Sequence, residues 1–143
     1  MPTIIVTAAC EGDGDRVIIQ RVLRAAGLEL GPVHVQNGKG NLDRNLSGYN
    51  YAAKLSHWLV LRDLNGDAPC APTLVSQLLP RPAELMSLRI AVRAAEAWLM
   101  ADRESFARFL GISVDILTRD PEQLLDPKGE VMRLAKRSRR REI

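Results

Sequence analysis

The sequence is poor in the side chains that most often bind zinc or form disulfides, with only two cysteines and two histidines among 143 residues. Cys10 and Cys70 stand alone, without a Cys-x-x-Cys spacing, so we interpret them as small buried residues rather than a disulfide. His34 and His57 are far apart and fall within expected strands. They give little support to a zinc site or a Ser-His-Asp arrangement.

Long apolar segments are also missing. No run approaches the roughly 20 residues that a membrane-spanning helix needs, and the first residues lack the basic start of a secretory signal. The hydrophobic share of 46% and the charged share of 26% are typical of a soluble globular protein. We therefore expect a cytoplasmic protein with no membrane partner.

Positive charge is distributed unevenly along the chain. Five of the 20 basic residues and one of the 17 acidic residues lie in the segment 136–143, so the rest of the chain has a formal charge of −1. This segment is the basic tail. It could neutralise the phosphates of a nucleic acid, although the same composition is typical of a solvated, frayed chain end.

Apolar segments of strand length alternate with segments of helix length. The pattern predicts strands at residues 3–8, 32–36, 57–62 and 88–92, and helices at about 16–26, 42–55, 72–79 and 94–101. This order predicts an α/β fold in which a mostly parallel sheet of about four strands is flanked by helices. Residues 1–135 should form one domain, helical from about residue 102 onwards, followed by the basic tail 136–143.

Two acidic, glycine-bearing loops follow the first and third expected strands, at residues 11–15 and 63–67. Ligands of open α/β sheets bind outside the carboxyl ends of the strands, where both loops should lie. Several carboxylates in such loops suit a hard cation such as Mg²⁺. Acidic residues there can instead cap helices, which we favour for Asp13. Glu11 and Asp63 terminate apolar strands that should lie at the same edge of the sheet, and we interpret them as functional.

Three other motifs are incomplete. Residues 12–14 begin like a dinucleotide-binding fingerprint, but Val17 stands where the third glycine should be. Residues 38–40 are not followed by the Gly-Lys-Ser/Thr that ends a P-loop motif. Residues 63–67 resemble the start of a calcium loop, which then lacks its glycine and its final glutamate.

The arrangement resembles the TOPRIM domain of topoisomerases, primases and certain nucleases, in which strand-Glu-Gly-x-x-Asp leads into a helix and strand-Asp-x-Asp follows. More narrowly, the chain resembles a bacterial family of TOPRIM-like proteins, domain of unknown function 4276, over about residues 4–135. The most specific segment is Arg-x-x-Glu-Ala-Trp-Leu-x-Ala-Asp at residues 93–102. Residues 38–42, 60–63, 70 and 126–128 also carry the likeness.

The resemblance implies roles for the two loops. Glu11 would be the general acid or base of phosphodiester cleavage or formation, and Asp63 would hold Mg²⁺ or Mn²⁺. Asn65, a neutral oxygen ligand, replaces the second aspartate of Asp-x-Asp, and Asp67 could restore the charge.

Three further residues are candidates. Glu96 could add a carboxylate to the metal site, or could be a glutamate favoured by a helix dipole at an N-terminus. Arg93 could bind a phosphate. Lys39, between two glycines, could approach a phosphate or belong to an exposed flexible loop.

Two functions of different class remain open. The first is a magnesium-dependent phosphodiester-processing enzyme, most simply a nuclease acting on nucleic acid, and the four acidic candidates favour it. The second is a non-catalytic TOPRIM-like module that binds nucleic acid, a nucleotide or a partner protein, such as an ATPase in a defence or repair system. Asn65 favours the second function. We prefer the enzyme.

Overall fold

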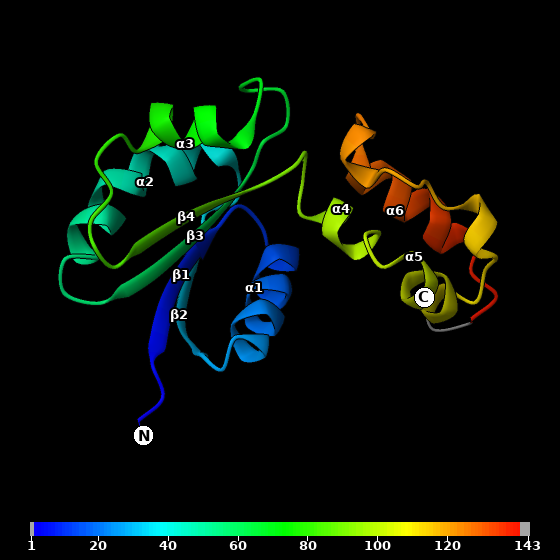
Figure 1. The fold of residues 1–143 in the computed structure, drawn as a ribbon, viewed down its shortest axis with the longest axis horizontal. Helices are drawn as coiled ribbons and strands as arrows, with labels where there is room; N and C mark the ends of the chain where they lie inside the picture. The colour runs from blue at the N-terminus through cyan, green and yellow to red at the C-terminus, as the bar shows by residue number, and fades with distance from the viewer. Residues whose placement is uncertain (1, 141–143) are drawn as a thin grey trace. The chain divides into compact units, whose positions relative to one another are not determined.

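The computed structural model describes residues 2–140, and the chain divides into two compact units between Ile90 and Ala91. A four-stranded parallel sheet has the order β2-β1-β3-β4 (Figure 1), which confirms the expected α/β fold. The strands are β1 (Ile5–Cys10), β2 (Glu29–Val35), β3 (His57–Asp63) and β4 (Met86–Ala91), and the helices between them are α1 (Asp13–Ala25), α2 (Lys39–Ala52) and α3 (Ala71–Leu78).

Helices cover both faces of the sheet, with α1 on one face and α2 and α3 on the other (Figure 1). The central strand β1 is built from small side chains, and Ala8, Ala9 and Cys10 have no exposed surface. Its register pairs Ala8 with Val33 of β2 and with Leu59 of β3. Parallel strands buried on both faces are nearly continuous apolar runs, and five of the six residues of β1 are apolar.

The main core lies between the sheet and the α2–α3 layer. Its buried residues are Ala9, Leu42, Leu46, Ala53, Trp58, Val60, Leu79, Met86 and Leu88. At its edge the ring of His34 stacks on that of Trp58 at 5.5 Å, and Tyr49 stacks on Trp58 at 4.9 Å. His34 therefore has a packing role in this layer.

Asp15 caps the first helix, whereas the sequence favoured Asp13 as the capping residue. The Asp15 carboxylate accepts a hydrogen bond from the backbone N–H of Gly12 at 3.0 Å, and Asp15 is buried whereas Asp13 is exposed. The sequence could not distinguish the two because either carboxylate suits the first turn of a helix.

Both cysteines are free thiols, as expected, but only Cys10 is buried. The expectation of burial is wrong for Cys70, which is exposed at the N-cap of α3. It ends a polar loop before a proline-started helix, where the chain lies at the surface.

The second unit is helical and has its own core of Met100, Ala107, Leu110, Leu117 and Leu134. Its elements are α4 (Glu96–Leu99), α5 (Arg103–Leu110), α6 (Pro127–Lys136) and the short 3-10 helices η1 (Val114–Ile116) and η2 (Pro121–Gln123). Asp102 and Asp126 cap α5 and α6. The unit begins at Ala91, and α4 packs against α6 within it.

The basic tail is held in place over the residues that the structure describes. Ser138 Oγ donates a hydrogen bond to the carbonyl oxygen of Leu110, and Arg140 Nη2 donates one to the carbonyl oxygen of Arg108. Ser138 and Arg140 are therefore attached to the end of α5. Residues 141–143 of the expected tail lie outside the described residues.

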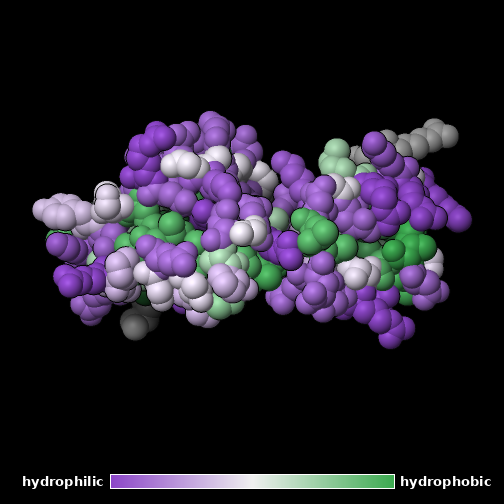
Figure 2. Space-filling view, turned by 90° about the horizontal axis from the view of Figure 1, so that it is seen from above, coloured by the Kyte–Doolittle hydropathy of each residue, from purple (hydrophilic) through white to green (hydrophobic). Residues whose placement is uncertain are grey.

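Charged and polar side chains cover most of the face shown in Figure 2, and hydrophobic side chains show between them in small groups. Among the described helices, none combines the length and the apolar character that crossing a membrane requires.

The core between the sheet and α2 gives a direct test of the packing. Leu42 is 1% exposed and Leu55 is 90% exposed. We expect Leu42→Ala to lower the free energy of unfolding by about 2–5 kcal/mol, and Leu55→Ala to change it by less than about 0.5 kcal/mol. Urea unfolding followed by circular dichroism measures both changes. Equal effects of the two variants would contradict this description of the core.

Candidate functional site

The strand order reverses between β1 and β3, and we use the name crevice for the sheet edge formed by the carboxyl ends of these two strands. From β1 the chain moves outward to β2, and it then returns to place β3 on the other side of β1. Such a reversal separates the loops that follow the two central strands, and ligands of doubly wound sheets bind there. Glu11 directly follows β1, and Asp63 is the last residue of β3. Both therefore belong to this crevice.

Glu11 is held directly against the end of β3. Its Oε2 accepts a hydrogen bond of 2.7 Å from the backbone N–H of Asp63. Its backbone oxygen accepts another, of 3.0 Å, from the N–H of Gly38, the residue that precedes α2. One residue thus joins the ends of β1 and β3 to the start of α2.

The half-buried position of Glu11 changes its acidity. Burial raises the pKa of Glu11 above its ordinary value, and the hydrogen bond from Asp63 together with the charge of Arg62 opposes this rise only in part. A carboxyl group with a raised pKa lies closer to the range in which it can both take up and release a proton near neutral pH.

A buried arginine organises the other charges near this edge. The side chain of Arg62 is 4% exposed. Its Nε and Nη2 donate to the two carboxylate oxygens of Asp43 at 3.2 and 2.9 Å, and its Nη1 donates to Asp67 Oδ2 and to the carbonyl oxygen of Asp63, both at 2.6 Å. This set of contacts, which we call the Arg62 cluster, joins α2, β3 and the loop after β3.

Asp67 and Lys39, both expected site residues, form an ion pair with each other. Lys39 Nζ lies 2.8 Å from Asp67 Oδ1 and 2.9 Å from Oδ2. The hydrogen bonds from Lys39, reinforced by the one from Arg62, lower the pKa of Asp67 below its ordinary value. Asp67 is therefore a carboxylate whose charge is balanced by two cations of the chain itself.

Asn65 occupies the turn that follows β3. Its backbone has φ of 51°, and the residue is exposed. Asparagine adopts this left-handed conformation more readily than most side chains. The turn therefore provides a structural reason for asparagine here, independent of any metal.

Arg93 and Glu96 belong to the second unit. Both are half-buried; Arg93 precedes the buried pair Ala94 and Ala95, and Glu96 is the first residue of α4. A glutamate in this position is favoured by the partial positive charge at the start of a helix.

The carboxylates near the crevice are few for a metal cage. Within residues 2–140, no group of three or more His, Cys, Asp or Glu side chains is arranged to hold a metal ion. Magnesium in proteins is often bound by one or two carboxylates, while waters and substrate phosphates complete its shell. Glu11 and Asp63 fit this mode of binding, in which only one or two carboxylates hold the ion.

Arg62 and Asp43 were not identified as site residues from the sequence. The available signal was an arginine inside an otherwise apolar strand, directly before Asp63. A buried charge requires a partner, so this position predicts an unidentified carboxylate nearby. The partner on α2 could not be identified, because many acidic residues lie at suitable distances along the chain.

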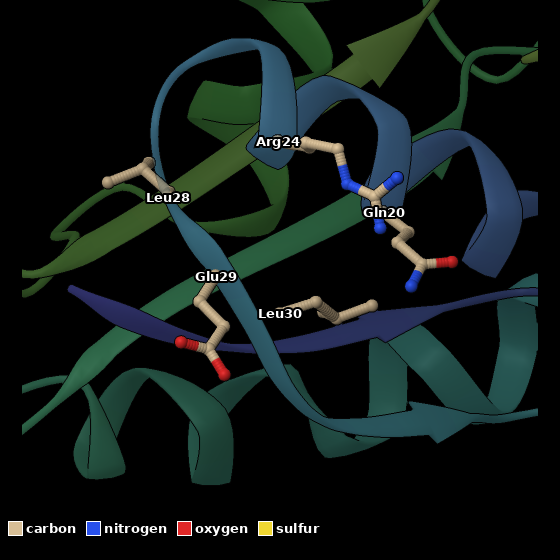
Figure 3. Close-up of a pocket in the computed structure, with 5 residues that line it drawn as sticks. All are labelled: Gln20, Arg24, Leu28, Glu29 and Leu30. Carbon is tan, nitrogen blue, oxygen red and sulfur yellow. The ribbon is translucent and has the colours of Figure 1, made fainter. Parts of the chain in front are cut away.

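A separate cavity of about 270 Å³ lies at the opposite end of the first unit. Figure 3 shows Gln20 and Arg24 projecting from α1 beside the start of β2, at Leu28, Glu29 and Leu30. Because it borders the amino end of β2, this cavity does not belong to the carboxyl edge where Glu11 and Asp63 lie.

Comparisons of the chain with protein-family models, with curated proteins and with solved structures found no match.

The Arg62 cluster predicts unequal effects of two charge deletions. Asp43→Ala removes two hydrogen bonds from a buried guanidinium, and we expect it to lower the free energy of unfolding by about 3 kcal/mol. Lys39→Met removes a cation whose side chain is 47% exposed, so we expect a loss below about 1 kcal/mol. Urea unfolding at pH 7 compares them. A loss from Asp43→Ala no larger than that from Lys39→Met would contradict the structural role of the cluster.

The raised pKa of Glu11 predicts a variant that is more stable than the wild type. Between the ordinary pKa and the raised pKa, the folded state binds more protons than the unfolded state, so wild-type stability falls as pH rises through this window. Glu11→Gln keeps an acceptor for the N–H of Asp63 and removes the buried charge. We expect its free energy of unfolding to exceed that of the wild type at pH 7, and the difference to disappear when Glu11 is protonated at low pH. Unfolding curves recorded from low pH to pH 7 measure this difference in free energy. A Glu11→Gln variant that is less stable than the wild type at pH 7 would refute the prediction.

Proposed function

We propose that this chain is a magnesium-dependent phosphodiester-processing enzyme of the nuclease type, acting on nucleic acid. One observation carries the proposal: the half-buried Glu11 carboxylate, with a raised pKa, is fixed against the end of β3 at the crevice between the two central strands. The resemblance to TOPRIM domains, and to domain of unknown function 4276, supports the same assignment.

In this proposal the two carboxylates have different tasks. Glu11 transfers the proton, because its raised pKa favours exchange near neutral pH. Asp63 provides the charge that holds the cation beside the substrate phosphate. Bound Mg²⁺ or Mn²⁺ would polarise the phosphoryl oxygen and stabilise negative charge on the leaving oxygen.

Lys39 is the best placed phosphate contact of the first unit. It is exposed at the start of α2, where the partial charge of a helix N-terminus also favours an anion. Binding a phosphate would draw Lys39 away from Asp67, and Arg62 would continue to balance that carboxylate. Arg93 remains a predicted phosphate contact, and Asn65, Asp67 and Glu96 remain predicted metal ligands.

A second candidate function is a non-catalytic module that binds nucleic acid, a nucleotide or a partner protein. The observation that favours it is the neutralised state of Asp67, which already has two cationic partners. With neutral Asn65 in the neighbouring turn, the crevice keeps few carboxylates for a cation. An ATPase partner in a defence or repair system is suggested by the proteins with which TOPRIM-like domains often occur.

Metal binding and cleavage distinguish these functions. We expect calorimetry to show Mg²⁺ or Mn²⁺ binding in the presence of an uncleavable phosphorothioate oligonucleotide, and Asp63→Asn to abolish it. We expect Glu11→Gln to retain this binding and to lower the rate of oligonucleotide cleavage by about 10²–10⁴-fold.

Asp13→Asn is the matched control, since Asp13 is an exposed carboxylate of the same loop region. It should match the wild type in both assays. Nucleic-acid binding without metal uptake or cleavage would reject the enzyme and establish the non-catalytic module.

A further inference from the structure

The second unit contains a cavity of about 470 Å³ with a strongly basic rim. It is lined by Gly111, Ile112, Ser113, Ile116, Arg137 and Arg139. Its charge comes from the two guanidinium groups alone, because none of the lining residues is acidic. The size falls in the range of pockets that hold small organic ligands, about 300–1,000 Å³.

The position of these arginines is fixed by their neighbours in the chain. Ser138 Oγ donates to the carbonyl oxygen of Leu110, and Arg140 Nη2 donates to that of Arg108 at 2.9 Å. The last carbonyls of a helix lack partners within it and attract cations. Ser138 and Arg140 therefore stabilise the end of α5, while the alternate residues Arg137 and Arg139 border the cavity.

Among the residues that the structure describes, neither rim arginine has an ion-pair partner. Within residues 2–140, the ion pairs involve Lys39, Arg62 and Arg133, and neither Arg137 nor Arg139 contacts a carboxylate. Ser113 Oγ accepts a hydrogen bond from the backbone N–H of Asp115 at 3.3 Å. Its hydroxyl proton can therefore be donated to a ligand.

We propose that this cavity binds the phosphodiester backbone of a nucleic acid, with a phosphate at each rim guanidinium and a hydrogen bond from Ser113. The planar guanidinium matches phosphate oxygens in a bidentate manner. The apolar side chains of Ile112 and Ile116 provide contact for a sugar. Backbone contacts of this kind position the nucleic acid and carry no sequence information.

The choice of nucleic acid as ligand rests on the proposed function, but binding at this cavity requires neither a metal nor Glu11. The test uses fluorescence anisotropy of labelled single-stranded and double-stranded oligonucleotides in EDTA. We expect the double variant Arg137→Ala/Arg139→Ala to weaken binding about tenfold or more at low salt. The slope of log K against log salt should become shallower, by about 1.4 for single strands and about 1.8 for duplex.

The matched control is Arg119→Ala/Lys128→Ala, which removes the same charge from two exposed residues of the same unit that do not line the cavity. It should bind like the wild type. Ser113→Asp keeps an oxygen acceptor for the N–H of Asp115 and places a negative charge in the cavity, so it should weaken binding as the arginine variant does.

Three results would overturn the inference: no oligonucleotide binding by the wild type, equal losses in the two double variants, or competition by polyglutamate as strong as that by unlabelled oligonucleotide. Because binding is measured in EDTA, where no metal-dependent cleavage takes place, failure of the catalytic proposal would appear as absent cleavage with this binding intact.

Discussion

The burial of one guanidinium constrains the whole carboxyl edge of the sheet. Arg62 lies in the strand layer with 4% of its side chain exposed, where an unpaired charge would cost several kcal/mol. Four hydrogen bonds to Asp43, Asp67 and the carbonyl oxygen of Asp63 offset that cost. Satisfying Arg62 therefore fixes the first turns of α2 and the loop after β3 in relation to each other.

The same arrangement separates the acidic side chains into two kinds. Asp67 is bound by Lys39 and Arg62, and its pKa is lowered. Glu11 is bound by a backbone amide in a half-buried position, and its pKa is raised. Carboxyl groups whose environments shift their pKa values in opposite directions are suited to different chemical roles. Under the proposed function, this contrast is a physical reason to assign proton transfer to Glu11 rather than to Asp67.

Much of this geometry was predictable because topology determines it. Strands alternating with helices imply a parallel sheet, and residues that follow its central strands must meet at one edge; Glu11 and Asp63 do. The Arg62–Asp43 contact was not predictable, because it depends on which turn of α2 packs against β3. The choice of Asp15 over Asp13 as cap, the exposure of Cys70 and the attachment of Ser138 and Arg140 to α5 likewise depend on contacts that spacing does not encode.

The charge pattern also bears on how a cation would bind. Carboxylates crowded together without a cation repel one another and raise one another's pKa. Here Asp43 and Asp67 have a guanidinium as partner, and neutral Asn65 occupies the turn. Asp43 and Asp67 therefore need no metal to balance their charge, and they offer a cation only a small net negative charge. Under the proposed function, the missing charge must come from the substrate phosphate, so cation and nucleic acid should bind cooperatively. Metal affinity measured without nucleic acid would then underestimate the affinity of the working site.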